Sequence, residues 1–216
     1  MKKNQRSKFQ KIKDFITFPV RSLLVTEHNK WGLTSLRNER YDYAAKEVKG
    51  YCLDVGCCRN NAFINNFLSG NGVGIDNFPF EGLTSAHLVE DFTKFPFKEK
   101  TFDSVTFLAN INHIPEKDRD LELSEAYRCL KTGGTIIIQT AIPWVSIVAH
   151  VTAEYYDKIF KTNHHTDTEM GMDEDDYYVK ESEVFERLKK AGFVDIKKKS
   201  FGTQWWLNRL YVGWKK

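Results

Sequence analysis

The chain has 216 residues, of which 41% are apolar and 14% are aromatic. It is therefore long enough to bury one sizeable core without a structural metal or disulfides. The first residues are charged and polar and no long apolar run follows them, so we expect a soluble, cytoplasmic protein without a membrane span or secretory signal.

Charge is concentrated in the N-terminal part. Residues 1–50 contain 12 Lys and Arg against 5 Asp and Glu, whereas the whole chain carries a net charge of only +3. Phe9, Ile12, Phe15 and Ile16 recur at helical spacing among lysines, which predicts a basic helical extension over residues 1–49. We expect this helix to pack on the domain with a solvated lysine face. The alternatives are contact with an anionic membrane surface and, less favoured, with RNA.

Residues 51–55 form an apolar run that leads into a loop containing Gly56. Such a strand, turn and helix arrangement lets backbone N–H groups face a ligand, while Asp54 can accept hydrogen bonds. A second apolar run ends about twenty residues later at Asp76, where a nucleotide-binding sheet holds ribose hydroxyls. The sequence therefore predicts a nucleotide-type cofactor site.

The remaining elements alternate between strands and helices. A third apolar stretch ends at Asp91, and a fourth strand over 102–110 ends at Asn110. The pattern then predicts a helix over 122–130, a strand over 135–138, a helix over 182–190, and strands over 193–196 and 205–214. This order indicates an α/β protein with a doubly wound sheet.

At this point the chain resembles the class I S-adenosylmethionine-dependent methyltransferases over residues 50–140, and is broadly similar to those of bacterial surface-polysaccharide pathways. The resemblance rests on residues 53–57, 91–92, 102–105, 112–115 and 130–134, together with Asp76. It implies a Rossmann-like, seven-stranded sheet that is mostly parallel, with an antiparallel C-terminal hairpin. Residues 50–216 would form one methyltransferase domain.

The resemblance also implies roles for individual residues. Asp54 and Gly56 would face the methionine part of S-adenosylmethionine, Asp76 the ribose, and Asp91 with Phe92 the adenine. The full implied cofactor-binding set is Asp54, Gly56, Cys58, Asp76, Asn77, Asp91, Phe92 and Asn110.

The glycine-rich loop departs from the family's Gly-x-Gly-x-Gly pattern, because Cys58 and Asn60 replace two glycines. Asn60 tolerates a positive φ and can serve a turn. Cys58 is small and apolar, so we expect a narrowed cofactor site. Two alternatives follow. One is a non-catalytic cofactor-binding module of the same fold. The other is a nicotinamide-dependent reductase, which is less favoured because it would need the glycines that this loop lacks.

His113 is the candidate catalytic base, since a neutral imidazole beyond the fourth strand could take a proton from the acceptor. The alternative is that His113 only shapes its loop. Arg40 and Tyr41, in a segment that often covers the cofactor site in this family, are further candidates for ligand contact.

The acceptor is expected to be a small molecule, a sugar or glycan, or a lipid-linked intermediate. The 141–179 insertion, rich in aromatic, histidine and acidic residues, is predicted to form the acceptor side. Nucleic acid is disfavoured, because the fourth strand is not followed by an Asn-Pro-Pro-Tyr sequence. No metal is expected, since His164, His165, Asp167 and Glu169 match no established ligand spacing.

Two tryptophans and two cysteines complete the set of expectations. Trp205 and Trp206 are expected to pack on the sheet or, alternatively, to line the acceptor pocket. Cys52 and Cys129 are expected to be reduced core residues.

Overall fold

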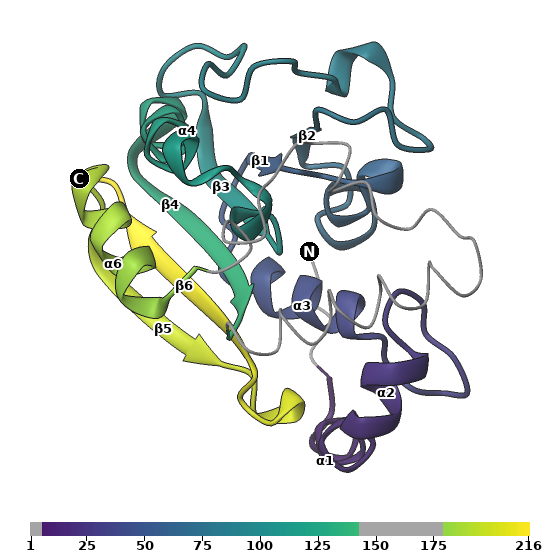
Figure 1. The fold of residues 1–216 in the computed structure, drawn as a ribbon. Helices are drawn as coiled ribbons and strands as arrows, with labels where there is room; N and C mark the ends of the chain where they lie inside the picture. Colours follow the sequence, from purple (N-terminus) through teal and green to yellow (C-terminus); the bar gives the residue numbers. More distant parts are fainter. Residues whose placement is uncertain (1–5, 143–178) are drawn as a thin grey trace.

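The computed structural model describes residues 6–142 and 179–216 (Figure 1). Its six strands are β1 (Cys52–Val55), β2 (Gly72–Ile75), β3 (Phe102–Leu108), β4 (Leu130–Ala141), β5 (Val194–Ser200) and β6 (Asn208–Trp214). They form one sheet in the order β2-β1-β3-β4-β6-β5. The first four strands pair in parallel, whereas β6 is antiparallel to both β4 and β5. The Rossmann-like sheet with an antiparallel C-terminal hairpin is confirmed.

The predicted count of seven strands is wrong by one within the described residues. The stretch that ends at Asp91 forms only an isolated parallel bridge, between Asp76 and Leu88. A 3-10 turn, η3 (Ser85–His87), precedes this bridge. Asp91 then turns the chain away, because its carboxylate accepts the backbone N–H of Thr93 at 2.9 Å. The stretch is therefore too short for a strand.

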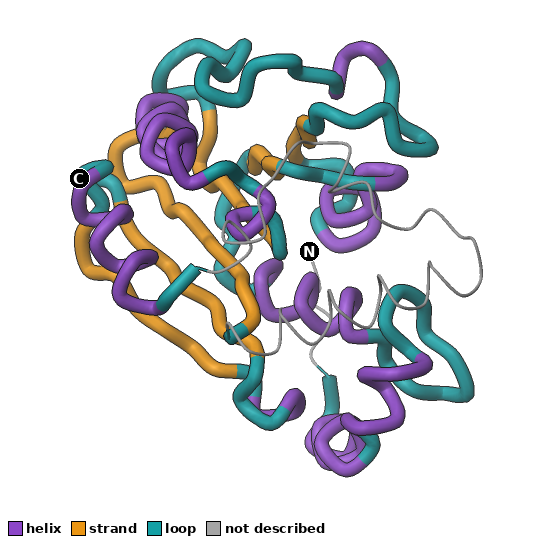
Figure 2. The backbone as a smooth tube through the Cα atoms, in the orientation of Figure 1, coloured by secondary structure: helices purple, strands orange, loops and turns teal. Residues whose placement is uncertain are grey.

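Helices cover both faces of the sheet (Figures 1 and 2). On one face α4 (Glu116–Cys129) and α6 (Glu181–Lys190) pack on an apolar cluster that includes Ile136 and Ile138. On the other face α3 (Leu36–Ala45) and the π-helical turn η2 (Phe63–Phe67) pack on a second cluster that includes Ile137. The alternating isoleucines of β4 thus join two cores, as strand geometry requires.

Two short helices precede this assembly, α1 (Lys8–Ile16) and α2 (Phe18–Leu24). Pro19 lies in the first turn of α2, where its missing N–H costs nothing. The predicted packing of α1 is wrong in its direction: the apolar Phe9, Ile12 and Ile16 are exposed, while Asp14 is fully buried. No helix that the structure describes is long and apolar enough to cross a bilayer.

The polar side of α1 docks through an ion-pair network, which explains this reversal. The Arg6 guanidinium contacts both the Asp14 carboxylate at 3.0 Å and the Glu39 carboxylate at 2.6 Å. Arg21 also pairs with Glu39, and Gln204 donates to the same carboxylate at 2.9 Å. Buried carboxylates without cations would be costly, so these pairs fix which side of α1 faces the protein.

Two further expectations need correction. The helix expected at 122 begins earlier, at Glu116, directly after Pro115. Trp205 and Trp206 lie before β6 and neither pack on the sheet nor line the cavity described below. Trp205 instead donates its indole N–H to the Phe15 carbonyl at 3.0 Å, against α1.

Candidate functional site

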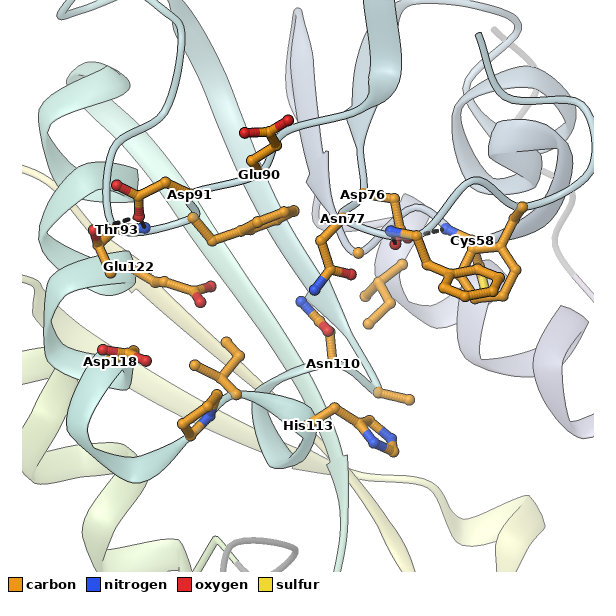
Figure 3. A pocket seen from close by; sticks show the side chains of 18 of the residues that line it. Cys58, Asp76, Asn77, Glu90, Asp91, Thr93, Asn110, His113, Asp118 and Glu122 are labelled. Atoms are coloured by element: carbon orange, nitrogen blue, oxygen red, sulfur yellow. Dashed lines mark hydrogen bonds between the residues drawn. The ribbon is translucent and has the colours of Figure 1, made fainter. Parts of the chain in front are cut away.

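A cavity of about 670 Å³ opens at the carboxyl ends of the parallel strands (Figure 3). Its walls come from the segments that follow β1, β2 and β3, from α4, and from the N-terminal segment up to α3. The sheet order reverses between β1 and β3, and such switch points are where doubly wound sheets bind ligands. The volume falls in the range of small-molecule sites, about 300–1,000 Å³.

Most residues of the predicted site meet at this cavity. Those that line it are Gly56, Cys58, Asp76, Asn77, Asp91, Phe92, Asn110 and His113. Figure 3 shows Cys58 and Asp76 at one end, Asp91 at the other, and Asn77 and Asn110 between them. Residues that are spread over 58 positions of the sequence therefore line one cavity.

Asp54 is the one predicted cofactor residue that does not line the cavity. It is buried in β1, and its carboxylate accepts the Thr106 hydroxyl at 2.6 Å. Burial raises the pKa of Asp54 to about 8, against the opposing effect of the Thr106 hydrogen bond. Asp54 thus supports the sheet beneath the glycine-rich loop.

Gly56 could not be another residue. Its φ is +73°, and a Cβ there would lie 2.5 Å from the Asn110 side chain. That side chain is held by its own hydrogen bond, from the Asn110 amide to the Val55 carbonyl at 3.1 Å. Asn110 therefore closes against the loop backbone, and only glycine leaves room for it.

The two glycine replacements in this loop keep glycine-like backbones. Asn60 has φ 60° and ψ 12°, which confirms its expected role in a turn. Cys58 has φ 56° and ψ −166°, a backbone region that residues other than glycine rarely occupy. Its β-carbon is therefore held in strained geometry at the cavity wall.

Asp76 is oriented by the backbone. One carboxylate oxygen accepts the Cys58 N–H at 2.8 Å, and the other accepts the Phe78 N–H at 3.1 Å. Burial raises the pKa of Asp76, and these N–H groups oppose that rise. Each oxygen keeps a further lone pair, so the carboxylate can still accept hydrogen bonds from a ligand.

Asp91 and Phe92 form the far end of the site. A single carboxylate oxygen of Asp91 accepts both the backbone N–H and the hydroxyl of Thr93, which lowers the pKa of Asp91. The Phe92 ring packs edge-on against Phe95 at a centroid distance of 6.1 Å. An oriented carboxylate beside an aromatic ring suits a planar base with an amino group.

Glu122 of α4 is a site residue that the sequence reading missed. It is 5% exposed, its Oε2 atom has no hydrogen-bond partner among the described residues, and it lines the cavity. Burial raises the pKa of Glu122 to about 8, reinforced by Asp118 and Asp91. The signal was present, because Glu122 occupies the buried stripe of α4 with Arg119 and Leu123.

A further wall comes from the N-terminal segment, where Arg40 and Tyr41 were the expected contacts. Arg37 pairs with Glu27, and both line the cavity. Arg40 and Tyr41 line it as well, and Arg40 makes no ion pair with any described residue. Two guanidinium groups therefore face a cavity that is otherwise acidic.

His113 lies in the 3-10 turn η4 (Ile111–His113) and lines the cavity. Its backbone N–H donates to the Asn110 carbonyl at 2.8 Å, which ties the turn to the end of β3. The predicted acceptor segment over 141–179 lies almost wholly outside the described residues, as do His164, His165, Asp167 and Glu169. The described residues contain no group of three metal-ligating side chains.

The fold and this cavity define a Rossmann-like nucleotide-cofactor domain, with acidic side chains at successive strand ends and a tight glycine turn after β1. Residues 53–138 match the family described as "Methyltransferase domain". The match covers less than half of the chain.

Two proteins of similar sequence put this match in context. The chain is 42% identical over 66 residues to a demethylmenaquinone methyltransferase of Streptomyces avermitilis, covering 31% of this chain and 26% of that protein. It is 29% identical over 127 residues to the chloroplastic 2-methyl-6-phytyl-1,4-hydroquinone methyltransferase 2 of Oryza sativa subsp. japonica, covering 58% and 30%. The matched regions therefore span less than a third of either relative.

The fold has counterparts among solved structures. A SAM-dependent methyltransferase from Archaeoglobus fulgidus superposes with a TM-score of 0.56 at 13% identity, over 84% of this chain and 95% of that one. At this identity the likeness concerns the fold alone.

Proposed function

We propose that the chain binds S-adenosylmethionine in this cavity and transfers its methyl group to a small-molecule acceptor. The observation that carries the proposal is the convergence of the ends of β1, β2 and β3 on one cavity that holds the Gly56 turn, Asp76 and Asp91. The methyltransferase domain match over residues 53–138 supports the same chemistry.

The charge of the cavity suits this cofactor. Six lining side chains carry carboxyl groups and two carry guanidinium groups. S-adenosylmethionine has a positive sulfonium and an ammonium group, which such a lining attracts.

Each part of the cofactor has a proposed partner. Asp76 would accept the ribose hydroxyls, with Asn77 beside it. Asp91 and Phe92 would hold the adenine through a hydrogen bond and ring contact. Arg40, which makes no ion pair among the described residues, would bind the methionine carboxylate.

When bound, the cofactor supplies a methyl group already activated by the sulfonium, so the chain needs to provide alignment and exclude water. The acceptor oxygen or nitrogen would gain this methyl group and lose a proton. His113 would take the proton that the acceptor loses. In that case His113→Asn would lower kcat about 100-fold or more and leave cofactor affinity unchanged.

The acceptor class follows from the relatives' names and the cavity size. Demethylmenaquinone and a phytyl hydroquinone are the substrates in those names, which favours a small molecule over a macromolecule. Sugar, glycan and lipid-linked acceptors remain alternatives within the proposal, with residues 141–179 on the acceptor side. A cytoplasmic location agrees with four unpaired cysteines.

The test is calorimetric and thermal binding of S-adenosylmethionine, S-adenosylhomocysteine and NADH in parallel, because a ligand specific to the folded state raises its stability. We expect saturable binding of both adenosyl ligands and none of NADH. Asp76→Asn should weaken that binding about 10- to 100-fold, through loss of charged hydrogen bonds. Asp195→Asn, on the distant hairpin, is the matched control.

Other outcomes discriminate the alternatives. Binding of NADH alone would favour a reductase. Binding of the adenosyl ligands without turnover in an acceptor screen would favour a non-catalytic cofactor-binding module. Binding of none of them would reject the cavity as a cofactor site.

A further inference from the structure

The N-terminal helices display apolar side chains to solvent. Phe9 is 77% exposed, Ile16 is 68% exposed and Leu23 is 80% exposed. Of the thirteen large apolar side chains exposed in the described residues, ten lie in this region. They are Phe9, Ile12, Phe15, Ile16, Val20, Leu23, Leu24, Trp31, Trp205 and Trp206. A cluster of this kind marks an interaction surface.

The helices α1 and α2, which carry most of the cluster, lie together at one end of the molecule (Figure 1). The Phe15 ring lies 6.3 Å from Trp205 and 6.2 Å from Trp206, between ring centroids. Trp31 is next to Gly32, whose carbonyl accepts the Lys13 ammonium at 2.9 Å. We call this surface the N-terminal apolar face.

Its orientation is held from beneath. Asp14 and Arg21 are fully buried, and both join the network around the buried Glu39. The Arg21 guanidinium also donates to the Asp14 carbonyl at 2.9 Å and to the Thr34 carbonyl at 2.7 Å. Turning the apolar face inward would break these hydrogen bonds and leave the buried charges without partners. The network therefore fixes the apolar face outward.

The charge around the face has one sign. At 100° per residue, Phe9, Ile12 and Ile16 form a stripe bordered by Lys8 on one side and Lys13 on the other. Over residues 6–26 the single acidic residue is the buried Asp14. The exposed charge of this segment is therefore positive throughout.

We propose that the N-terminal apolar face binds the surface of an anionic lipid bilayer. Apolar side chains rimmed by lysines match the boundary between acyl chains and negative headgroups. A second copy of the chain would bring like-charged lysines together. RNA would bind by stacking its bases on aromatic side chains, whereas half of these ten side chains are aliphatic and cannot stack. The proposal is independent of methyl transfer.

The test is flotation of the full chain with two kinds of vesicle, one of phosphatidylcholine alone and one containing about a quarter phosphatidylserine. We expect binding to the anionic vesicles, little binding to the neutral ones, and weakening by salt. The double variant Phe9→Gln with Leu23→Gln should lose binding about tenfold or more, since both side chains would enter the lipid. Lys8→Gln with Lys11→Gln should weaken it on anionic vesicles.

Matched controls change the same residue types elsewhere. Leu121→Gln removes an exposed leucine on α4, and Lys98→Gln removes an exposed lysine. Both should bind as the parent does. Because every substituted side chain is exposed, thermal unfolding should show all variants folded.

Three results would overturn the proposal. The first is no binding of the parent to anionic vesicles, and the second is equal binding by the Phe9 and Leu23 double variant. The third is a dimer in light scattering that this double variant converts to a monomer, without vesicle binding. That result would assign the face to a second copy of the chain.

Discussion

The N-terminal helices and the sheet bury opposite kinds of side chain. Around α1 and α2 the interior holds Asp14, Arg21 and Glu39, while the apolar side chains face solvent. In the sheet Leu53 and Phe107 are fully buried. Ion pairs fix which side of a helix faces the protein more specifically than apolar burial does. The N-terminal region can therefore keep its apolar side chains outside. The contrast separates a surface for interaction from a core for stability.

The sharpest test compares a buried phenylalanine of the sheet with an exposed one of α1. Phe107→Ala should reduce the free energy of unfolding by about 3–5 kcal/mol, because it removes a buried ring and leaves a cavity. Phe9→Ala should change it by less than about 0.5 kcal/mol, since its ring is exposed. Denaturant unfolding measures both. A large loss from Phe9→Ala would mean that the apolar face is buried in solution.

The polar interior has its own test. Glu39→Gln would remove the buried carboxylate that Arg6 and Arg21 share, and we expect a loss of about 3–5 kcal/mol in unfolding free energy. Glu47→Gln breaks only the exposed pair with Lys199 and should cost less than about 1 kcal/mol. Equal effects of the two changes would contradict the network.

Glu39 also predicts a pH dependence. Burial opposes ionisation, but Arg6 and Arg21 outweigh it and lower the pKa of Glu39 below its ordinary value of 4.5. Its contribution to stability is thus present above pH 4.5 and is lost as pH falls through the lower folded pKa.

Glu122 sharpens the comparison from the other side, as a buried carboxyl group at the wall of the cavity. The unfolded chain ionises it near pH 4.5, whereas the folded chain keeps its proton up to about pH 8. Stability is therefore full below 4.5 and falls as pH rises to about 8. At the upper end Glu122→Gln should be more stable than the parent by about 2–4 kcal/mol. Parallel pH profiles of parent and variant would refute this, as would the same gain from Glu186→Gln on α6.

The smallest expected effect concerns the strained loop. Cys58→Gly should raise unfolding free energy by about 1 kcal/mol, because relief of strain exceeds the entropy that glycine adds to the unfolded chain. Cys58→Ala keeps a β-carbon and should give no such gain. Equal stability of the two variants would show that the loop is unstrained.

Much of the sheet could be predicted from the sequence, because each buried strand reads as a short apolar run that ends in a polar residue. Asp76 and Asn110 mark the ends of β2 and β3 in this way. Parallel strands bring such ends to one edge, so their meeting at a cavity follows from topology alone.

The rest depended on contacts between distant segments. Arg6 and Glu39 are 33 positions apart, and no local pattern reveals that they pair. The spacing of apolar residues in α1 predicted that these side chains pack inward. The ion pair between Arg6 and Glu39 instead holds the polar side of the helix against the protein. Finding Glu122 required knowing which side of α4 faces the protein. The predicted start of this helix was six residues too late, so that side could not be assigned.

Hydrogen exchange with and without S-adenosylhomocysteine tests the central claim most directly, because it reports each segment separately. We predict slower exchange over residues 56–61, 76–80, 90–93 and 108–115, and unchanged exchange in β5 and in the exposed turns of α1. Protection confined to other segments, or absent at saturating ligand, would contradict the assignment of the cavity to this cofactor.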